Sequence, residues 1–177
     1  MSCLTSGLSI DCANSCAGGL SKFWVASVAD ITSLNITAGE IDTITMVATK
    51  KFYEFEPYQE TGNFTETGER VNCNTVVTQT LVAVFPCHAL TTREAIQELQ
   101  DCCCGFVVIH EENNGTRWLW GAPKDLTTLG IAYPAQLTNY ETVTGTAIND
   151  QNQSTITLTA RGTVQAIPVA STVTIPV

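Results

Sequence analysis

The stretch that decides the fold runs from Thr91 to Gly121 and reads TTREAIQELQDCCCGFVVIHEENNGTRWLWG. Its first half predicts one amphipathic helix over about residues 92–104. Thr91 and Glu94 have the spacing of a capping box, in which a hydroxyl and a carboxylate satisfy free backbone N–H groups at a helix start. The stretch therefore predicts one capped helix followed directly by strands.

Apolar side chains in the predicted helix repeat at helical steps. Ile96, Leu99 and Cys103 are separated by three and four residues, which places them on one face. Gly105 follows, and glycine readily takes the left-handed conformation that ends a helix. We expect this face to lie against a sheet.

The second half of the stretch predicts a β-hairpin. Residues 106–110 are β-branched or aromatic, and Asn114-Gly115 is a strong signal for a two-residue turn. Residues 116–121 form the returning strand. A helix laid against antiparallel strands is thus the expected centre of the fold.

Elsewhere the chain reads mainly as strands. We expect a loop at 30–39, a flap at 57–74 that forms a hairpin or a long loop, and a tail at 164–177 that proline confines to an edge strand or arm. The expected strands are 22–28, one strand from 41 to 56, a long strand at 75–85, and a late hairpin of 139–145 with 155–161.

These elements predict a mainly β fold, a sandwich or barrel of antiparallel strands with a single flanking helix and extended terminal arms. The expected organisation is an N-terminal arm at 1–21, a β domain at 22–163 and a C-terminal strand or arm at 164–177. At 177 residues the chain is long enough for one well-buried core.

Charge and composition exclude several functions. Only 14% of residues are charged, against about 25% in ordinary globular proteins, which favours a subunit that hides surface against neighbours or a compact Thr-rich β protein. Because the net charge is −9 and no Lys/Arg cluster is longer than Lys50-Lys51, we do not expect tight nucleic-acid binding. No apolar run approaches the roughly 18 residues of a membrane helix.

The eight cysteines lack the spacing of a structural metal site. Cys12-x-x-x-Cys16 is the best fragment of one. No secretory signal is visible, so we expect reduced thiols, most of them acting as small buried hydrophobic residues. For the same reason we expect no glycosylation, and we interpret the four Asn-x-Ser/Thr sequons as ordinary turn residues. They lie at Asn35, Asn63, Asn114 and Asn152. No metal or cofactor is expected.

Catalytic patterns are also missing from the sequence. Cys87 beside His88, and the run at 102–104 with His110, are the candidate Cys/His pairs, but adjacency in sequence is no sign of a dyad. Glu54 and Glu56 share a strand face, where solvated acids are far commoner than a glycosidase pair. We therefore expect no enzyme.

The order of features resembles that of phage tail tube proteins, whose subunits stack as rings and form the DNA conduit of long-tailed phages. The resemblance covers most of the chain: a small polar N-terminal arm, a polar flap at 54–70, a long strand at 75–85, one helix at 91–104, an Asn113-Asn114-Gly115 turn with its Trp-Leu-Trp strand, and a late Thr-rich hairpin.

This resemblance implies a self-assembling virion subunit, made in the bacterial host cytoplasm, that forms stacked hexameric rings and contacts other tail proteins. Sheets joined edge to edge would line the lumen, and an acidic lumen would pass DNA without specific binding. We expect stacking contacts in both arms and in the flap, with Tyr58, Phe64 and Arg70 as anchors. The resemblance does not extend to the cysteines of the N-terminus.

Three alternatives stay open. One is another virion structural protein, such as a connector, neck or decoration subunit. A second is a carbohydrate- or protein-binding β module, because Trp118 and Trp120 lie on one face of their strand and could stack on sugar. The third is an enzyme, which would need a pocket holding Cys87, His88 or His110 with a partner.

Overall fold

The computed structural model describes residues 18–177 except 88, 128–129, 131 and 148–149. The predicted N-terminal arm lies almost wholly outside the described residues, as do Cys3, Cys12, Cys16 and His88. The elements are β1 (Leu20–Ser27), a short 3-10 turn (Val28–Asp30), β2 (Ile31–Thr37), β3 (Glu40–Met46), β4 (Tyr53–Phe55), β5 (Asn63–Val71), β6 (Asn74–Pro86), α1 (Leu90–Asp101), β7 (Phe106–Glu112), β8 (Arg117–Trp120), β9 (Gln136–Val143), β10 (Gln153–Gly162) and β11 (Ile167–Val169).

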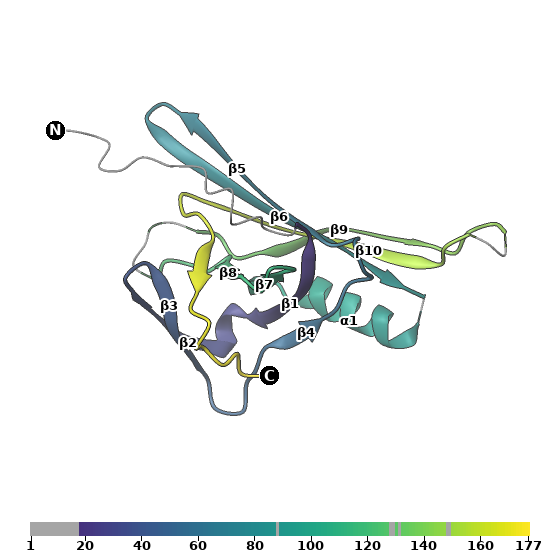
Figure 1. Cartoon of the computed structure of the whole chain (residues 1–177), viewed down its shortest axis with the longest axis horizontal. Coiled ribbons are helices and arrows are strands. Elements are labelled where there is room, and N and C mark those ends of the chain that lie inside the picture. The colour runs from purple at the N-terminus through teal and green to yellow at the C-terminus, as the bar shows by residue number, and fades with distance from the viewer. Residues whose placement is uncertain (1–17, 88, 128–129, 131, 148–149) are drawn as a thin grey trace.

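Two sheets form the body of the molecule (Figure 1). The larger sheet has seven strands in the order β2-β3-β11-β8-β7-β1-β4, and the smaller has four in the order β5-β6-β10-β9. The four-stranded sheet runs across the top of Figure 1, and its β5–β6 hairpin and its β9–β10 end extend past the body on opposite sides. The predicted mainly β sandwich with a single helix is confirmed.

The seven-stranded sheet is buried on both faces around β7. One core lies between the two sheets and under α1, and the other lies on the far face, closed by the β2–β3 hairpin and the C-terminal residues Val173 and Ile175. Phe106 and Val108 belong to the first core, while Val107 and Ile109 belong to the second. A continuous apolar run is therefore required in this strand, because both faces exclude water.

The helix is confirmed, but its start is not as predicted. It begins at Leu90 with Ala89 as N-cap and no side-chain cap, so the capping box of Thr91 and Glu94 is wrong. Ile96 and Leu99 are buried against the first core as expected. Since the helix ends at Asp101, Cys103 lies beyond it and is exposed.

Gly105 follows the helix with φ +75°, the left-handed conformation that was expected. A Cβ here would lie 2.6 Å from Pro134 Cβ and 2.9 Å from the Ala135 carbonyl oxygen, whereas at Gly115, φ +85°, it would meet nothing within 4 Å. Gly105→Ala is thus expected to cost at least about 3 kcal/mol of stability, against about 1 kcal/mol for the matched Gly115→Ala. Urea unfolding of both variants measures this difference, and equal losses would contradict the steric explanation.

Three hairpins are held by tight turns. The β7–β8 loop has three residues between Glu112 and Thr116. Its Gly115 N–H donates to the Glu112 carbonyl at 2.8 Å, and Gly115 forms a bulge with positive φ. The predicted two-residue turn is therefore one residue too short. Ala38-Gly39 and Asn72-Cys73 are two-residue turns with positive φ throughout.

Two predictions in the first third of the chain are wrong. The stretch 30–39, expected as a loop, is mostly β2, because the Ala38-Gly39 turn pairs it with β3. The single strand expected from 41 to 56 is two strands, β3 and β4, separated by a turn in which Lys50 N–H donates to the Val47 carbonyl at 3.0 Å and Thr49 has φ +70°. The two halves consequently join different places in the same sheet.

The tail is the third correction. β11 lies inside the seven-stranded sheet between β3 and β8, whereas an edge strand or arm was expected. Pro168 is tolerated because the parallel contact with β3 is short: Val169 pairs with Ile41, and Ala170 N–H donates to the Ile41 carbonyl at 2.9 Å. By contrast, the long strand, the first strand and the late hairpin are confirmed within a few residues of their predicted bounds.

Candidate assembly surfaces

The four-stranded sheet offers two open edges. Within the described part of the chain, β5 and β9 have a strand on one side only. Its inner face is buried, with Leu81, Ala83, Ile156 and Leu158 each 1% exposed or less. A sheet with open edges and one buried face presents backbone donors and acceptors for pairing with another strand.

The outer face of this sheet is lined by rows of threonine. Thr65 of β5 is opposite Thr80 of β6, which is opposite Thr159 of β10, and the Thr159 hydroxyl lies 3.0 Å from that of Thr138 on β9. Cross-strand threonine pairs of this kind stabilise a sheet while keeping its surface polar and uncharged. The row extends across all four strands.

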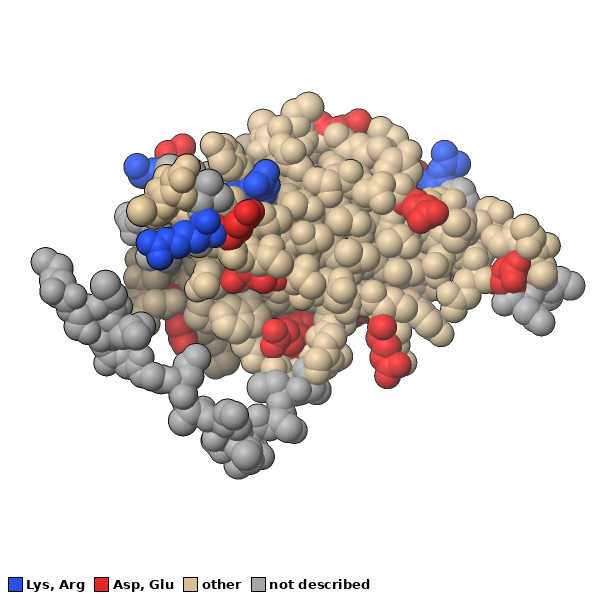
Figure 2. All heavy atoms as spheres, turned by 90° about the horizontal axis from the view of Figure 1, so that it is seen from above, with Lys and Arg blue, Asp and Glu red and all other residues tan. Residues whose placement is uncertain are grey.

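Few charged side chains belong to the outer face. By strand alternation they are Glu69 of β5, Arg161 of β10 and Glu141 of β9. Figure 2, the view from above Figure 1, shows a broad uncharged area with charged side chains towards its margins. The face is therefore close to neutral although the whole chain carries −9.

The predicted flap residues are distributed along β5 and the segment before it. Tyr58 is 52% exposed, and its N–H donates to the Val84 carbonyl at 2.7 Å. Arg70 is exposed near the Asn72-Cys73 tip, six residues from Phe64 and thus about 20 Å along the strand. Phe64 points inward and is half-buried in its own chain, so the three residues do not form one patch. Their interface role stays a prediction.

An aromatic cluster holds the flap to the larger sheet. The Phe64 ring centroid lies 4.1 Å from that of His110 and 5.5 Å from that of Trp120. Trp120 Nε1–H donates to His110 Nδ1 at 3.2 Å, so the proton of the neutral imidazole is on Nε2. Burial lowers the pKa of His110 to about 3, and the ring is neutral at physiological pH.

Glu66 provides a second anchor for the flap. Its Oε2 accepts hydrogen bonds from Gln79 Nε2 at 2.8 Å and from the Ala166 N–H at 2.7 Å. The buried Gln79 amide is thereby satisfied, and β5 is tied to the segment that leads into β11. The flap is accordingly not a free loop: its strand β5 pairs with β6 and is braced by these bonds.

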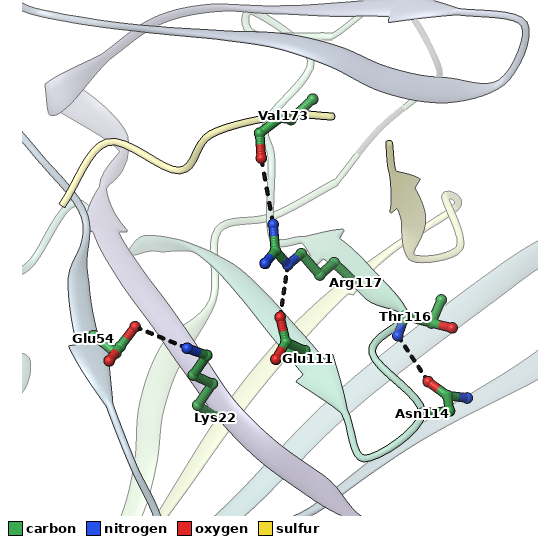
Figure 3. Close-up of polar contacts among 7 residues, drawn as sticks. All are labelled: Lys22, Glu54, Glu111, Asn114, Thr116, Arg117 and Val173. Atoms are coloured by element: carbon green, nitrogen blue, oxygen red, sulfur yellow. Dashed lines mark hydrogen bonds and ion pairs between the residues drawn. The ribbon is translucent and has the colours of Figure 1, made fainter. Parts of the chain in front are cut away.

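Cations on the far side of the larger sheet have structural partners (Figure 3). Arg117 donates to Glu111 at 2.7 Å and to the Val173 carbonyl at 3.3 Å, and Lys22 pairs with Glu54 at 3.5 Å. Both cations also lie over the Trp24 ring, at 5.0 Å for Lys22 and 5.6 Å for Arg117. Glu54 thus has a cationic partner, which supports its interpretation as a strand-face acid.

The cysteines correct another expectation. Cys73, Cys87, Cys103 and Cys104 are exposed, and only Cys102 is half-buried, with its Sγ 3.7 Å from Ser27 Oγ. The prediction that most act as buried hydrophobic residues is wrong for the described ones. Over the described residues, no three Cys, His, Asp or Glu side chains gather as metal ligands.

The tryptophan pair does not form a sugar platform. Trp120 is 2% exposed and lies in the first core. Trp118 is half-buried, and its Nε1 is buried with no hydrogen-bond partner in the described structure. A pair that is packed in this way has no shared open face for stacking on a glycan.

Sequence reasoning missed the threonine rows on β5, β6 and β9. Thr65-Glu66-Thr67 and Thr78-Gln79-Thr80 carry the same alternation as β10, and that signal was available. Their alignment across strands depends on register.

No helix among the described residues is long and apolar enough to span a membrane. No family model matches the chain, and no curated protein sequence or solved structure matches it significantly.

Proposed function

We propose that this chain is a structural subunit of a phage tail tube that assembles into stacked, hexameric rings in the host cytoplasm and in the virion. The observation that carries the proposal is the four-stranded sheet with open edges at β5 and β9, one buried face and one hydroxyl-rich face that carries few charges. Pairing β5 of one copy with β9 of the next would continue the sheet around a ring.

The threonine-rich face is the proposed lumen lining. It differs from the strongly acidic lumen implied by the resemblance, since its outward charges are two carboxylates and one guanidinium. DNA would pass because the lining offers little cationic charge to hold phosphates, with weak repulsion added. The flap and the N-terminal segment are the proposed contacts between rings.

Negative-stain electron microscopy of the purified chain across a concentration series, with mass measured on the same samples, tests the proposal. We expect regular tubes or stacked rings. Closed rings that never stack would favour a connector, neck or decoration subunit. A monomer of about 19 kDa at every concentration would contradict self-assembly.

Blocking an edge is expected to prevent assembly. Neighbouring residues of an edge strand direct their N–H groups alternately towards the sheet and towards solvent. Proline has no N–H group. Of the two neighbouring variants Tyr140→Pro and Glu141→Pro on β9, one therefore removes an N–H that points to the open edge, and the other removes an N–H that points to β10. We expect the open-edge variant to unfold at nearly the native temperature yet to need at least about tenfold more protein to assemble.

The other variant, the one whose missing N–H points to β10, is the matched control, because it breaks a hydrogen bond within the sheet and should lose stability. Thermal unfolding separates the two, and microscopy over the same concentrations measures assembly. Normal assembly by the stably folded variant would exclude β9 as a pairing edge.

A further inference from the structure

A recess of about 780 Å³ lies on the hydroxyl-rich face of the four-stranded sheet. Its lining includes Tyr133, Gln136, Thr138, Thr159 and Arg161, and Arg161 is the one charged residue among those that line it. Arg161 is exposed, and no described residue forms an ion pair with it. The recess thus presents an unpaired guanidinium among hydroxyl and amide groups, which suits a carboxylate.

The two open edges of this sheet lie at different heights along the strands. Gln136, the first residue of β9, is level with Thr65 of β5 when the pairing is followed across β10 and β6. From this level β9 runs towards one end of the sheet, and β5 runs towards the other end, at the Asn72-Cys73 tip (Figure 1). Consequently only residues 63–65 of β5 and 136–139 of β9 lie at shared levels.

A copy must therefore slide along its neighbour before the two edges can pair in full. The slide is an even number of residues, because an odd number would turn the threonines of one copy to the other face. A slide of four residues brings the whole of β9 beside residues 63–69 of β5 in the next copy. Gln136 is then opposite Glu69 of that copy.

The geometry of a closed barrel supports this slide. Each copy contributes four strands and a slide of four residues, so the shear of the closed ring equals its number of strands. The eight-stranded barrel has the same ratio, and its strands tilt by about 36°, within the usual range of about 35–45°. A slide of six residues would tilt the strands beyond that range, and a slide of two would leave part of β9 unpaired.

Resting on the proposed pairing of β5 with β9, we propose that Glu69 of the next copy enters the recess and forms an ion pair with Arg161. After the slide, Glu69 lies two strands across and two residues along from Arg161, which separates their Cα atoms by about 12 Å. Two extended side chains of these types span that distance. Glu69 is exposed and belongs to the same face as Arg161.

Glu69 of the same chain is a poorer partner for Arg161. It lies across β6 at a similar separation, yet the two form no ion pair in the described structure, and Glu69 does not line the recess. The half-buried Val76 is directly opposite Glu69 on that side. Opposite charges left unpaired towards the two edges of one face would select the copy and the register that pair.

Mixing two charge-reversed variants tests the ion pair. Arg161→Glu gives every junction two carboxylates, and Glu69→Arg gives every junction two guanidinium groups. Like charges disfavour the contact, so we expect each variant alone to need at least about tenfold more protein to assemble. An equimolar mixture should assemble like the native chain, because alternating copies bring opposite charges together at every junction. An ion pair within one chain could not be restored by mixing.

Glu141→Arg is the matched control, because it makes the same charge change on the same face, opposite Thr65 of the next copy. It should not draw the Arg161→Glu chain into tubes, as measured by mass spectrometry of pelleted tubes. Thermal unfolding should show native stability for the variants, since Glu69 and Arg161 are exposed.

Assembly is measured by light scattering and negative-stain microscopy over a concentration series. A mixture that assembles no better than its two components would overturn the ion pair, and so would single variants that assemble like the native chain. In both cases tubes of the native chain leave the proposed function standing. Absence of any particle from the native chain would overturn both proposals.

Discussion

Trp120→Ala is expected to lower the free energy of unfolding by about 3–5 kcal/mol. The indole is 2% exposed, lies in the core between the two sheets and contacts the Phe64 ring. Its loss would leave a cavity in that core and remove the donor to His110 Nδ1. Denaturant unfolding followed by far-UV circular dichroism measures the change.

Trp118→Ala is the matched control, because it removes the same side chain two residues away on the same face. Trp118 is half-buried, and its Nε1 makes no hydrogen bond in the described structure. We expect a smaller loss of about 1–2 kcal/mol. Equal losses in the two variants would mean that Trp120 is not the main packing residue of this strand.

Acid is expected to destabilise the chain through His110. Burial lowers its pKa to about 3 in the folded state, against the ordinary value of 6.5 when unfolded. Between these values the unfolded chain binds a proton that the folded chain does not, so stability falls as the pH drops below about 6.5. The loss is complete below about pH 3, with an upper limit of roughly 5 kcal/mol.

His110→Asn isolates this contribution, because an amide oxygen can accept from Trp120 Nε1 but does not titrate. Unfolding free energies from pH 7 to pH 4 should fall more steeply for the native chain than for the variant. Glu112, which lines a recess together with His110, is present in both chains, so its titration is common to them. Parallel pH profiles would show that the imidazole is not held neutral by burial.

Local signals predicted the elements that depend on neighbouring residues. The helical repeat of Ile96 and Leu99 led to α1, and the alternation of Ile156, Leu158 and Ala160 led to β10 with its buried face. The capping box failed because the helix begins one residue earlier than Thr91, at Leu90, with Ala89 as its N-cap, so Thr91 is already inside the first turn. β2 was missed because the Ala38-Gly39 turn was interpreted as part of a long loop.

The candidate surfaces were less predictable than the elements. Tyr58, Phe64 and Arg70 were chosen from one polar stretch, but the register of β5 against β6 turns Phe64 inward onto His110. Nothing in the stretch itself specifies that register, since polar and apolar side chains do not alternate strictly there. The exposure of Cys103 was also not predictable from its position in the helical repeat, because the helix ends at Asp101 and leaves the Cys103 side chain exposed.

The sequence by itself determined the mainly β class, the single helix, the long β6 strand and the late Thr-rich hairpin, because periodicity and turn chemistry act over a few residues. Only the tertiary structure decided that β11 enters the larger sheet between β3 and β8, that β7 is buried on both faces, and that the threonines of four strands align in one row. These features depend on contacts between segments far apart in the chain. Their stability comes from the apolar area that those segments bury together, which no local window of sequence contains.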